Sequence, residues 1–249
     1  NVVQGKASFL DAHRVAVGDK EFSGDHIIIA TGTRPRILPN ILVDGQRVIT
    51  SDEAINLSYS PKSILILGAG VIGCEFASIF KAVGTEVYLV DTKAEIMSNE
   101  DRDISEFLKN AFDAMNIHVI PSSYYQSHEV LEDGVRTTLS SEEIETEMLL
   151  LAVGRMPCTD NINLEATGVD LDLRNYIKID TNCRTNVPHI YAVGDIGTRK
   201  VPGDLSLVHV AEAEGRCAAA HILGLEYPQF LDHIPYIVFT VPMLAGVGV

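Results

Sequence analysis

One stretch constrains the fold of this chain more than any other: Ser63-Ile-Leu-Ile-Leu-Gly-Ala-Gly-Val-Ile-Gly-Cys-Glu-Phe-Ala-Ser-Ile-Phe80. Its first five residues form an apolar run that predicts a strand buried on both faces. Gly68, Gly70 and Gly73 follow at the spacing GxGxxG. Apolar residues then recur with a helical period, at Phe76, Ile79, Phe80 and Val83. The stretch therefore predicts a strand, a glycine turn and a helix.

A second strand with an acid at its end completes the pattern. The run Thr85–Val90 predicts this strand, and Asp91 follows 18 residues after Gly73. A strand, glycine turn, helix, strand and terminal acid in this order are the dinucleotide-binding fingerprint. GxGxxG alone is also compatible with a plain strand–helix turn, and the surrounding pattern favours nucleotide binding.

Each residue of the fingerprint has an expected role. Gly68 permits the tight turn, Gly70 lets the backbone approach a pyrophosphate, and Gly73 lets helix and strand pack closely. The helix N-terminus offers free N–H groups and a positive dipole end to the phosphates. Asp91 can accept both ribose hydroxyls and would repel a 2′-phosphate, so NAD is expected and NADP stays possible because Lys93 is near.

Charge and cysteine spacing exclude several classes of protein. The net charge of −15 argues against nucleic acid and anionic membrane partners, which need clustered Lys and Arg. Apolar runs stay well short of the ~20 residues of a membrane span, and the first residues lack a signal-peptide layout. The four cysteines have neither metal-site nor CxxC or CxxxxC spacing. A cytoplasmic protein with reduced, structural thiols and no metal site is expected.

The chain also contains an internal repeat. Residues 27–35 and 149–157 share three apolar residues, Ala, any residue, Gly, two residues and Pro. Strand-like segments precede both, over Ala7–Val17 with a turn at residues 18–19 and over Tyr124–Leu139 with a turn at residues 132–134. Gly68 lies 86 residues before Gly154, and the same offset before Gly32 falls upstream of residue 1. We expect a duplicated dinucleotide-binding unit whose first βαβ lies outside this chain; chance similarity of two buried strands is the alternative.

Further elements can be predicted from periodicity. Residues 188–195 form another strand that ends in Gly and an acid. Leu205–Leu223 predicts a helix with Asp204 or Ser206 as its N-cap. Asp101–Met115 predicts an amphipathic helix with Ile104, Leu108, Ala111 and Met115 on one face, and His118–Ile120 the next strand. Ile234–Phe239 is typical of the opening strand of a further domain.

Four ordered motifs resemble those of the flavin-dependent pyridine nucleotide–disulfide oxidoreductases. They are Ala30-Thr-Gly-Thr-Arg-Pro35, the GxGxxG at Gly68, Ala152-Val-Gly-Arg155 and Tyr191-Ala-Val-Gly-Asp195. The resemblance covers essentially the whole chain. Within the family, residues 68–80 are most similar to the soluble pyridine nucleotide transhydrogenases, with the dihydrolipoamide dehydrogenases as the alternative.

The resemblance implies an α/β fold in which a Rossmann-like NAD-binding domain, a parallel sheet plus a β-meander, is inserted into an incomplete FAD-binding domain. It places residues 1–50 and 179–230 in the FAD domain, residues 51–178 in the NAD(P) domain, and residues 231–249 at the start of a truncated dimer-interface domain. A homodimer is implied for the full-length protein.

The resemblance also implies flavin contacts, by Thr31, Gly32, Thr33, Asp195, Leu207, Val208 and His209. Asp195 resembles the acid that hydrogen-bonds the ribityl chain of FAD. The helix start at residues 207–209 resembles the segment placed against the flavin pyrimidine edge, where a helix N-terminus stabilises negative charge. For His209 a backbone role is favoured over acid–base chemistry.

The implied NAD contacts form a larger set: Gly68, Ala69, Gly70, Val71, Ile72, Gly73, Glu75, Asp91, Val119 and Gly154. Two interpretations of Glu75 are open, an acid near the nicotinamide or a favourable charge in the first helical turn. No catalytic residue is assigned within this chain.

The chain departs from the family pattern at three points. The first GxGxxG, the CxxxxC disulfide and the C-terminal His–Glu pair are absent from the sequence. We therefore expect part of a flavoprotein that transfers hydride between a nicotinamide and FAD, and little activity of this chain alone. A non-catalytic NAD-binding module is the alternative from another class, and bound FAD in the purified protein would discriminate between them.

Overall fold

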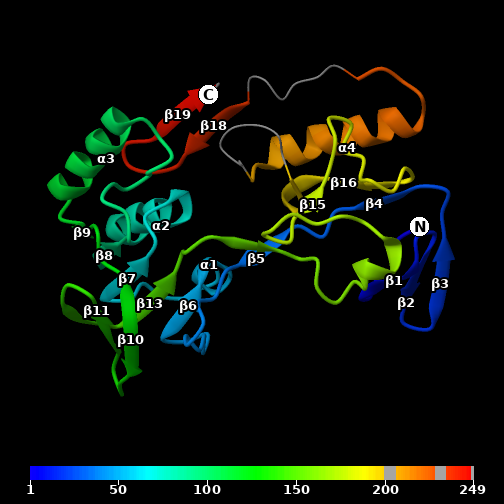
Figure 1. The fold of residues 1–249 in the computed structure, drawn as a ribbon. Coiled ribbons are helices and arrows are strands. Elements are labelled where there is room, and N and C mark those ends of the chain that lie inside the picture. Colours follow the sequence, from blue (N-terminus) through cyan, green and yellow to red (C-terminus); the bar gives the residue numbers. More distant parts are fainter. Residues whose placement is uncertain (199–205, 228–233, 248–249) are drawn as a thin grey trace. The chain divides into compact units, whose positions relative to one another are not determined.

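The computed structural model describes residues 1–198, 206–227 and 234–247, and the chain divides into two compact units. Unit 1 comprises Asn1–Arg34, Met156–Tyr236 and Val247–Val249, and unit 2 comprises Pro35–Arg155 and Ile237–Gly246. The second unit is thus an insertion into the first, as Figure 1 shows by the colour sequence of its elements.

The unit boundaries differ from the domain limits expected at residues 50/51 and 178/179. Strand β6 (Val48–Thr50) pairs within the sheet of unit 2, so that unit already begins at Pro35. Leu164 and Ile177 are buried in a core cluster of unit 1, so the return to unit 1 occurs at Met156. The assignment of the two units to NAD and FAD stays a prediction.

Unit 2 is built on a parallel sheet with the strand order β6-β13-β7-β8-β9. The other strands are β7 (Ser63–Leu67), β8 (Glu86–Val90), β9 (His118–Ile120) and β13 (Met148–Leu151). The limits predicted for β7 and β9 are confirmed, and β8 begins one residue later than predicted. Leu65 and Leu67 are buried toward one face, and by strand alternation Ile64 and Ile66 face the other. This confirms the predicted α/β class with a strand buried on both faces.

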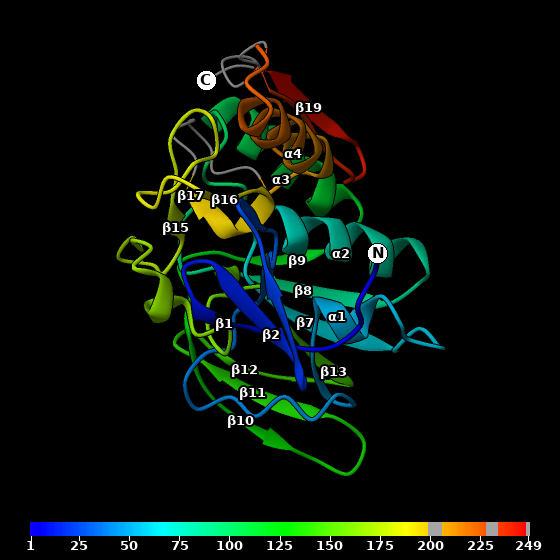
Figure 2. The same cartoon turned by 90° about the vertical axis from the view of Figure 1, so that its right-hand side faces the viewer.

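Helices cover one face of this sheet and an antiparallel meander covers the other (Figure 2). The helices are α2 (Val71–Ala82) and α3 (Arg102–Ala114), and the meander strands are β10 (Tyr125–Val130), β11 (Val135–Leu139) and β12 (Glu143–Thr146). The turn predicted at residues 132–134 joins β10 to β11. Val135, Leu139 and Ile144 of the meander pack against the sheet in one core cluster. A short helix, α1 (Ser51–Ala54), follows β6.

The predicted helices are present, but their buried faces differ from the predicted faces. In α2, Phe76 and Phe80 are buried, whereas Ile79 and Val83 are 52% and 56% exposed. In α3, the buried residues are Ser105, Leu108 and Phe112 rather than the predicted stripe beginning at Ile104. The observed face accommodates Ser105, whose hydroxyl donates hydrogen bonds to the carbonyls of Ile96 and Met97.

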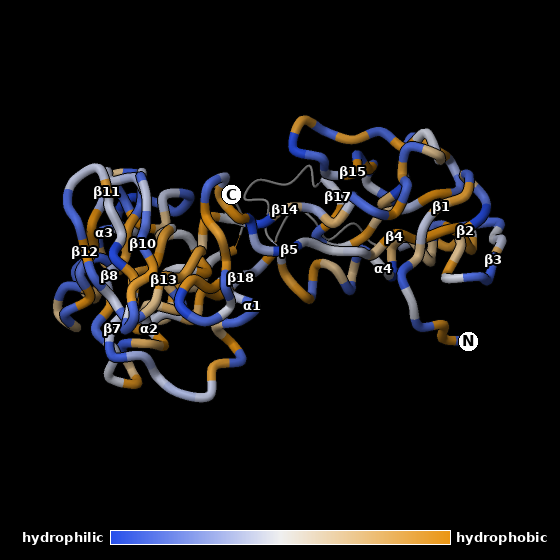
Figure 3. The backbone as a smooth tube through the Cα atoms, turned by 90° about the horizontal axis from the view of Figure 1, so that it is seen from below, coloured by the Kyte–Doolittle hydropathy of each residue, from blue (hydrophilic) through white to orange (hydrophobic). Residues whose placement is uncertain are grey.

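The hydropathy of the chain follows this layering (Figure 3). The tube is largely orange along β13, whose four residues are all buried. The meander strands mix orange and blue, in keeping with one buried and one solvent-facing side. Among the described residues, none of the helices combines the length and apolar character needed to cross a membrane.

Unit 1 has smaller sheets around two core clusters. Strands β1 (Ala7–Asp11), β2 (Arg14–Val17) and β3 (Lys20–Ser23) are antiparallel, and β4 (Ile27–Ile29) pairs in parallel with β16 (Ile190–Ala192). The turn predicted at residues 18–19 joins β2 to β3. The remaining elements are β15 (Ile177–Lys178), β17 (Gly197–Thr198), the 3₁₀ helices η1 (Leu164–Thr167) and η2 (Gly194–Ile196), and helix α4 (Val208–Ile222).

Two short strand pairs complete the chain. Strands β5 (Thr33–Pro35) and β14 (Arg155–Pro157) pair where the chain passes between the units. Strands β18 (Pro235–Val238) and β19 (Leu244–Val247) form a terminal pair, and β18 corresponds to the strand predicted over residues 234–239. Residues 237–246 contact unit 2 rather than standing apart.

Candidate functional site

The glycine turn between β7 and α2 has the backbone conformation that its sequence predicts. Gly68 has φ +103°, and a Cβ there would lie 2.3 Å from the Ala152 carbonyl oxygen. Its N–H donates to the Val90 carbonyl across 2.7 Å. Gly68 is therefore required by both the turn and its close approach to the end of β13.

Gly73 packs against the same turn. A Cβ at Gly73 would lie 1.8 Å from the Gly68 carbonyl oxygen and 3.6 Å from the Ala152 Cβ. The close packing expected at this residue is present, and its nearest partner is the turn rather than a strand.

Gly70 differs from both of these glycines because it faces open space. It is the N-cap of α2, no side chain caps the helix, and no atom lies within 4 Å of the position of a Cβ. Gly70 and Val71 are exposed, Ile72 is half-buried and Ala69 is buried. The first N–H groups of α2 thus lack a side-chain acceptor at an accessible helix end, which is the arrangement that binds phosphate.

Asp91 lies at the carboxyl end of β8, beside the turn. Its Oδ2 accepts a hydrogen bond from the Ala69 amide at 2.7 Å, and its Oδ1 accepts one from the Lys93 amide at 2.9 Å. The Lys93 ammonium donates to Ser98 Oγ at 2.6 Å. The structure therefore brings the acid of the fingerprint into contact with the glycine turn.

Glu75 has a partner that the sequence did not indicate. This half-buried side chain lies in α2, and its Oε1 accepts a hydrogen bond from the Phe239 amide at 2.8 Å. One turn later, Ser78 Oγ accepts a hydrogen bond from the Val241 amide at 3.2 Å. Glu75 and Ser78 together fasten the chain around β18 to helix α2. The expected proximity of Glu75 to a nicotinamide stays a prediction.

The two remaining nucleotide candidates lie near the same edge of the sheet. Gly154 has φ +107° and its carbonyl accepts a hydrogen bond from the Arg36 amide at 2.9 Å. It lies two residues after Ala152, which approaches Gly68. Val119 is half-buried in β9 and is paired with Leu89 of β8. Both follow from the parallel sheet, whose strands all end at this edge.

The flavin candidates lie in unit 1. Thr33 Oγ1 donates to Asp195 Oδ2 at 3.0 Å, and Thr31 Oγ1 donates to the Cys158 carbonyl at 2.9 Å. Gly32 has φ +66°, and its carbonyl accepts a hydrogen bond from the Cys158 amide at 2.9 Å. The structure thus joins Thr33 to Asp195 across 162 residues of sequence.

Glu214 supports the loop that carries Asp195, and sequence analysis missed it. Its side chain is buried in α4, and Oε2 accepts a hydrogen bond from the Gly194 amide at 2.7 Å. Gly194 has φ +73°. A signal was present in the sequence, because Val210, Glu214, Cys217 and Ala218 form a buried stripe with helical spacing that contains one acid.

The start of α4 corrects the predicted N-cap. The helix begins at Val208 with Leu207 as its N-cap and no side-chain cap, so Ser206 does not cap it. Asp204 lies outside the described residues. The exposed His209 donates from Nε2 to the Pro235 carbonyl at 2.9 Å. Val208 is 87% exposed, so the end of the helix is accessible.

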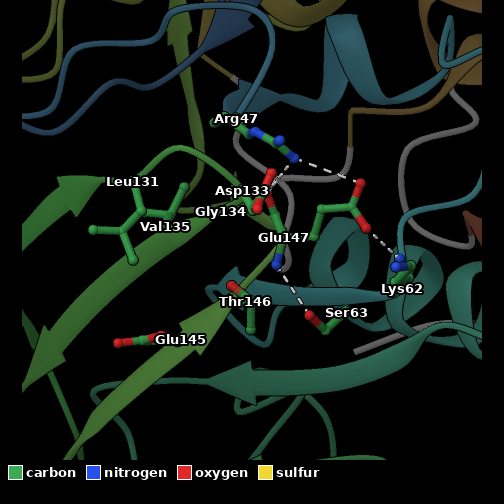
Figure 4. Close-up of a pocket in the computed structure, with 10 residues that line it drawn as sticks. All are labelled: Arg47, Lys62, Ser63, Leu131, Asp133, Gly134, Val135, Glu145, Thr146 and Glu147. Atoms are coloured by element: carbon green, nitrogen blue, oxygen red, sulfur yellow. Dashed lines mark hydrogen bonds and ion pairs between the residues drawn. The ribbon is translucent and has the colours of Figure 1, made fainter.

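Unit 2 also has a polar pocket of about 490 Å³ at the opposite edge of its sheet (Figure 4). Its position follows from Ser63, which begins β7, and from Glu147, which precedes β13. Glu147 accepts a hydrogen bond from the Lys62 amide at 2.7 Å and pairs with Arg47 at 3.5 Å. The lining residues are Arg47, Lys62, Ser63, Leu131, Asp133, Gly134, Val135, Glu145, Thr146 and Glu147. Glu147 is bound by Arg47 and by the Lys62 amide. These contacts connect the starts of neighbouring strands, so we assign the residues of the pocket a structural role.

The cysteines are free thiols. Cys74 Sγ donates to the Ala69 carbonyl at 3.3 Å, and burial raises the pKa of this thiol to about 12. In the described part of the chain, no three His, Cys, Asp or Glu side chains are grouped so as to hold a metal.

Comparison with known proteins gives a family and several relatives. The family model for pyridine nucleotide-disulphide oxidoreductase matches residues 1–215. The chain is 36% identical to the dihydrolipoyl dehydrogenase of Geobacillus stearothermophilus, covering 99% of this chain and 53% of that protein. It is 37% identical to the soluble pyridine nucleotide transhydrogenase of Aliivibrio fischeri, covering 100% of this chain and 53% of that protein. The chain thus spans about half the length of the curated relatives it matches.

Two solved protein structures are also similar to this chain over nearly its whole length. The HOCl-induced flavoprotein disulfide reductase RclA of Escherichia coli matches with a TM-score of 0.89 and 28% identity, over 100% of this chain and 57% of that one. LpdA of Mycobacterium tuberculosis matches with a TM-score of 0.88 and 29% identity, over 99% of this chain and 55% of that one.

Proposed function

The chain belongs to the pyridine nucleotide-disulphide oxidoreductase family, and we propose that unit 2 binds NAD(H) for an FAD-dependent oxidoreductase of which this chain is a part. The family depends on flavin and NAD(P). The observation that carries the proposal is the junction of the Gly68 turn, the uncapped start of α2 and Asp91.

The residues of unit 2 fit a dinucleotide. Open space above Gly70 leaves room for a pyrophosphate, and the N–H groups of the first turn of α2 would hold it. Asp91 accepts one backbone hydrogen bond at each oxygen and one from the Thr92 hydroxyl at Oδ1, which leaves acceptor capacity at Oδ2 for a ribose hydroxyl. The hydride chemistry itself would be supplied by the nicotinamide and the flavin when both are bound.

The residues of unit 1 fit part of a flavin site. We propose that Thr33 and Asp195 bind the ribityl chain. Glu214 of α4 accepts a hydrogen bond from the Gly194 amide and so fixes the loop that carries Asp195. The accessible start of α4 at Val208 would stabilise negative charge on a reduced ring. These residues bind and orient a cofactor, and none of them is proposed as an acid or base.

For the whole protein we propose a soluble pyridine nucleotide transhydrogenase, with dihydrolipoyl dehydrogenase as the second candidate. The amino-acid sequence of residues 68–80 favours the transhydrogenase. The 36% identity of the chain to a dihydrolipoyl dehydrogenase supports the second candidate. We also propose that the whole protein acts in the cytoplasm and assembles as a homodimer.

Calorimetric titration of the 249-residue chain with NADH tests the assignment of unit 2. One NADH bound per chain supports it, and absence of binding to the folded chain contradicts it. In a longer form of the protein, NADH-to-NADP⁺ hydride transfer supports a transhydrogenase, whereas NADH formation that depends on dihydrolipoamide supports the second candidate.

A further inference from the structure

A loop with one left-handed residue lies against the glycine turn of unit 2. Residues 91–101 connect β8 to α3, and Met97 within this loop has φ +47°. A residue with a side chain rarely adopts this conformation, which persists only where surrounding contacts hold it. Ile96 and Met97 are 2% and 3% exposed, so buried side chains anchor this part of the loop.

The backbone of Met97 binds the glycine turn directly. Its amide donates a hydrogen bond to the Ala69 carbonyl at 2.8 Å. The Ala69 amide in turn donates to Asp91 Oδ2 at 2.7 Å, so Ala69 is bound through both of its backbone groups. Cys74 Sγ adds a longer hydrogen bond to the same carbonyl, at 3.3 Å. Because Ala69 precedes Gly70, these contacts set the direction in which the accessible start of α2 points.

Ser105 holds Met97 from the side of α3. Its side chain is buried, and its hydroxyl donates to the Ile96 carbonyl and, at 3.3 Å, to the Met97 carbonyl. The Met97 carbonyl also accepts a hydrogen bond from the Glu100 amide at 2.8 Å. An alanine at position 105 would suit a helix better than serine does, but it would take this buried donor away from the loop. The hydroxyl therefore stabilises the loop rather than the helix that carries it.

We propose that Ser105 is a positioning residue of the nucleotide site. Its hydroxyl fixes Met97, the Met97 amide fixes Ala69, and Ala69 fixes both the phosphate-facing end of α2 and the Asp91 carboxylate. This inference rests on the proposed binding of NAD(H) by unit 2. A site that already has its binding geometry loses less conformational freedom when the ligand arrives. Loss of the hydroxyl should therefore weaken binding by loosening the site, without removing a contact to the nucleotide.

Amide hydrogen exchange of the nucleotide-free 249-residue chain tests the contacts themselves. The Met97 and Ala69 amides donate the two hydrogen bonds that join the loop, the turn and Asp91. In Ser105→Ala we expect both amides to exchange at least about tenfold faster than in the parent chain, as measured by NMR spectroscopy. This measurement does not depend on any ligand.

Calorimetric titration with NADH then tests what these contacts do for binding. We expect Ser105→Ala to bind NADH about fivefold more weakly than the parent chain, at a temperature where circular dichroism shows both to be folded. The matched control is Thr85→Val, which removes another buried hydroxyl, one that donates to the Pro61 carbonyl at 2.8 Å. Thr85 precedes β8 whereas Asp91 follows it, so this variant alters the opposite end of the strand. Thr85→Val should lower the melting temperature and leave both NADH affinity and the exchange of the Met97 amide unchanged.

Three results would overturn the positioning role and leave the NAD site itself in place. They are unchanged exchange of the Met97 and Ala69 amides in Ser105→Ala, faster exchange with unaltered NADH affinity, and an equal loss of affinity in Thr85→Val. The last of these would show that NADH affinity follows general stability. Failure of the folded parent chain to bind NADH is a different outcome, because it contradicts the proposed function and with it any role of Ser105 in that function.

Discussion

Asp91 Oδ2 accepts a hydrogen bond from the Ala69 amide at 2.7 Å, so the acid at the end of β8 is bound to the glycine turn at the end of β7. Its other oxygen accepts a hydrogen bond from the Lys93 amide at 2.9 Å. One carboxylate therefore both builds the turn and faces the place where a ribose is expected. Oδ1 also accepts a hydrogen bond from the Thr92 hydroxyl at 3.4 Å, so Oδ2 is the oxygen that keeps a lone pair for a hydroxyl group.

This arrangement predicts a preference for NADH over NADPH. A 2′-phosphate would approach a carboxylate that is fixed by two backbone amides, and the Lys93 ammonium is bound to Ser98 instead. We expect NADPH to bind the chain about tenfold more weakly than NADH, in calorimetric titrations at the same salt concentration. Equal or tighter binding of NADPH would show that Asp91 does not contact the ribose.

Gly70→Val should abolish NAD binding and preserve the fold. No atom lies within 4 Å of a Cβ at Gly70, so the side chain meets only the space expected for a pyrophosphate. We expect affinity for NADH to fall at least about 100-fold with an unchanged circular dichroism spectrum. Gly73→Ala is the contrasting variant: its Cβ would lie 1.8 Å from the Gly68 carbonyl oxygen, and it should lower thermal stability. Retained affinity in Gly70→Val would refute the site.

The purified 249-residue chain should hold FAD weakly or not at all. A GxGxxG that could bind the FAD pyrophosphate is absent from residues 1–34, and that element contributes a large share of dinucleotide affinity. Absorbance between 300 and 550 nm, compared with protein concentration, measures the flavin content. A yellow protein with about one flavin per chain would contradict the predicted placement of the FAD site.

Glu214→Ala should destabilise unit 1 more than Glu214→Gln does. Alanine leaves the buried Gly194 amide without its acceptor, whereas glutamine can still accept that hydrogen bond. We expect losses in the free energy of unfolding of about 3 kcal/mol and about 1 kcal/mol, respectively, measured by urea denaturation. Equal losses in the two variants would mean that the contact with Gly194 does not stabilise the fold.

Glu53 should contribute to stability at neutral pH but not in acid. Hydrogen bonds from the Thr50 hydroxyl and amide, at 2.6 and 2.8 Å, lower the pKa of Glu53 below its ordinary value of 4.5. Since the folded-state pKa is lowered, the stabilisation is complete above the unfolded-state value and is lost as the pH falls through the folded-state value. Glu53→Gln should cost about 1 kcal/mol at pH 7.

Urea denaturation at a series of pH values measures this effect. The difference between the parent chain and Glu53→Gln should narrow below about pH 4. Asp52→Asn is the matched control, because Asp52 lies in the same turn and is exposed. A difference that stays constant down to pH 3 would rule out the ionised capping box as its source.

The sequence predicted unit 2 well because its elements are defined by local patterns. Strands β7 and β9 have the predicted limits, and the glycine turn has the predicted conformation. Helix faces were less accurate because they depend on tertiary partners. Ser105 is buried by its hydrogen bonds to Ile96 and Met97, which no hydrophobic pattern could indicate.

Contacts between distant segments account for most of what was missed. Glu75 was considered either for its charge at a helix start or for a nicotinamide contact, and its observed partner lies 164 residues later in the chain. Cys183 and Cys217 likewise share one core cluster because α4 packs against the turn that contains Thr181. The Thr33–Asp195 hydrogen bond joins two residues that only the family resemblance had linked.

The return of the chain at β5 and β14 has a genetic consequence. Residues 35–155 leave unit 1 and come back at nearly the same point, where the Arg36 amide bonds to the Gly154 carbonyl at 2.9 Å. The flanking segments are already joined within unit 1, by the Cys158 amide on the Gly32 carbonyl and by the Arg34–Asp160 pair at 2.7 Å. Because the two ends of this segment meet, two crossovers at the junction could exchange it for a homologous segment that keeps the contacts of α2 with residues 237–246. The junction is therefore a natural place for grafting a domain of different nucleotide preference.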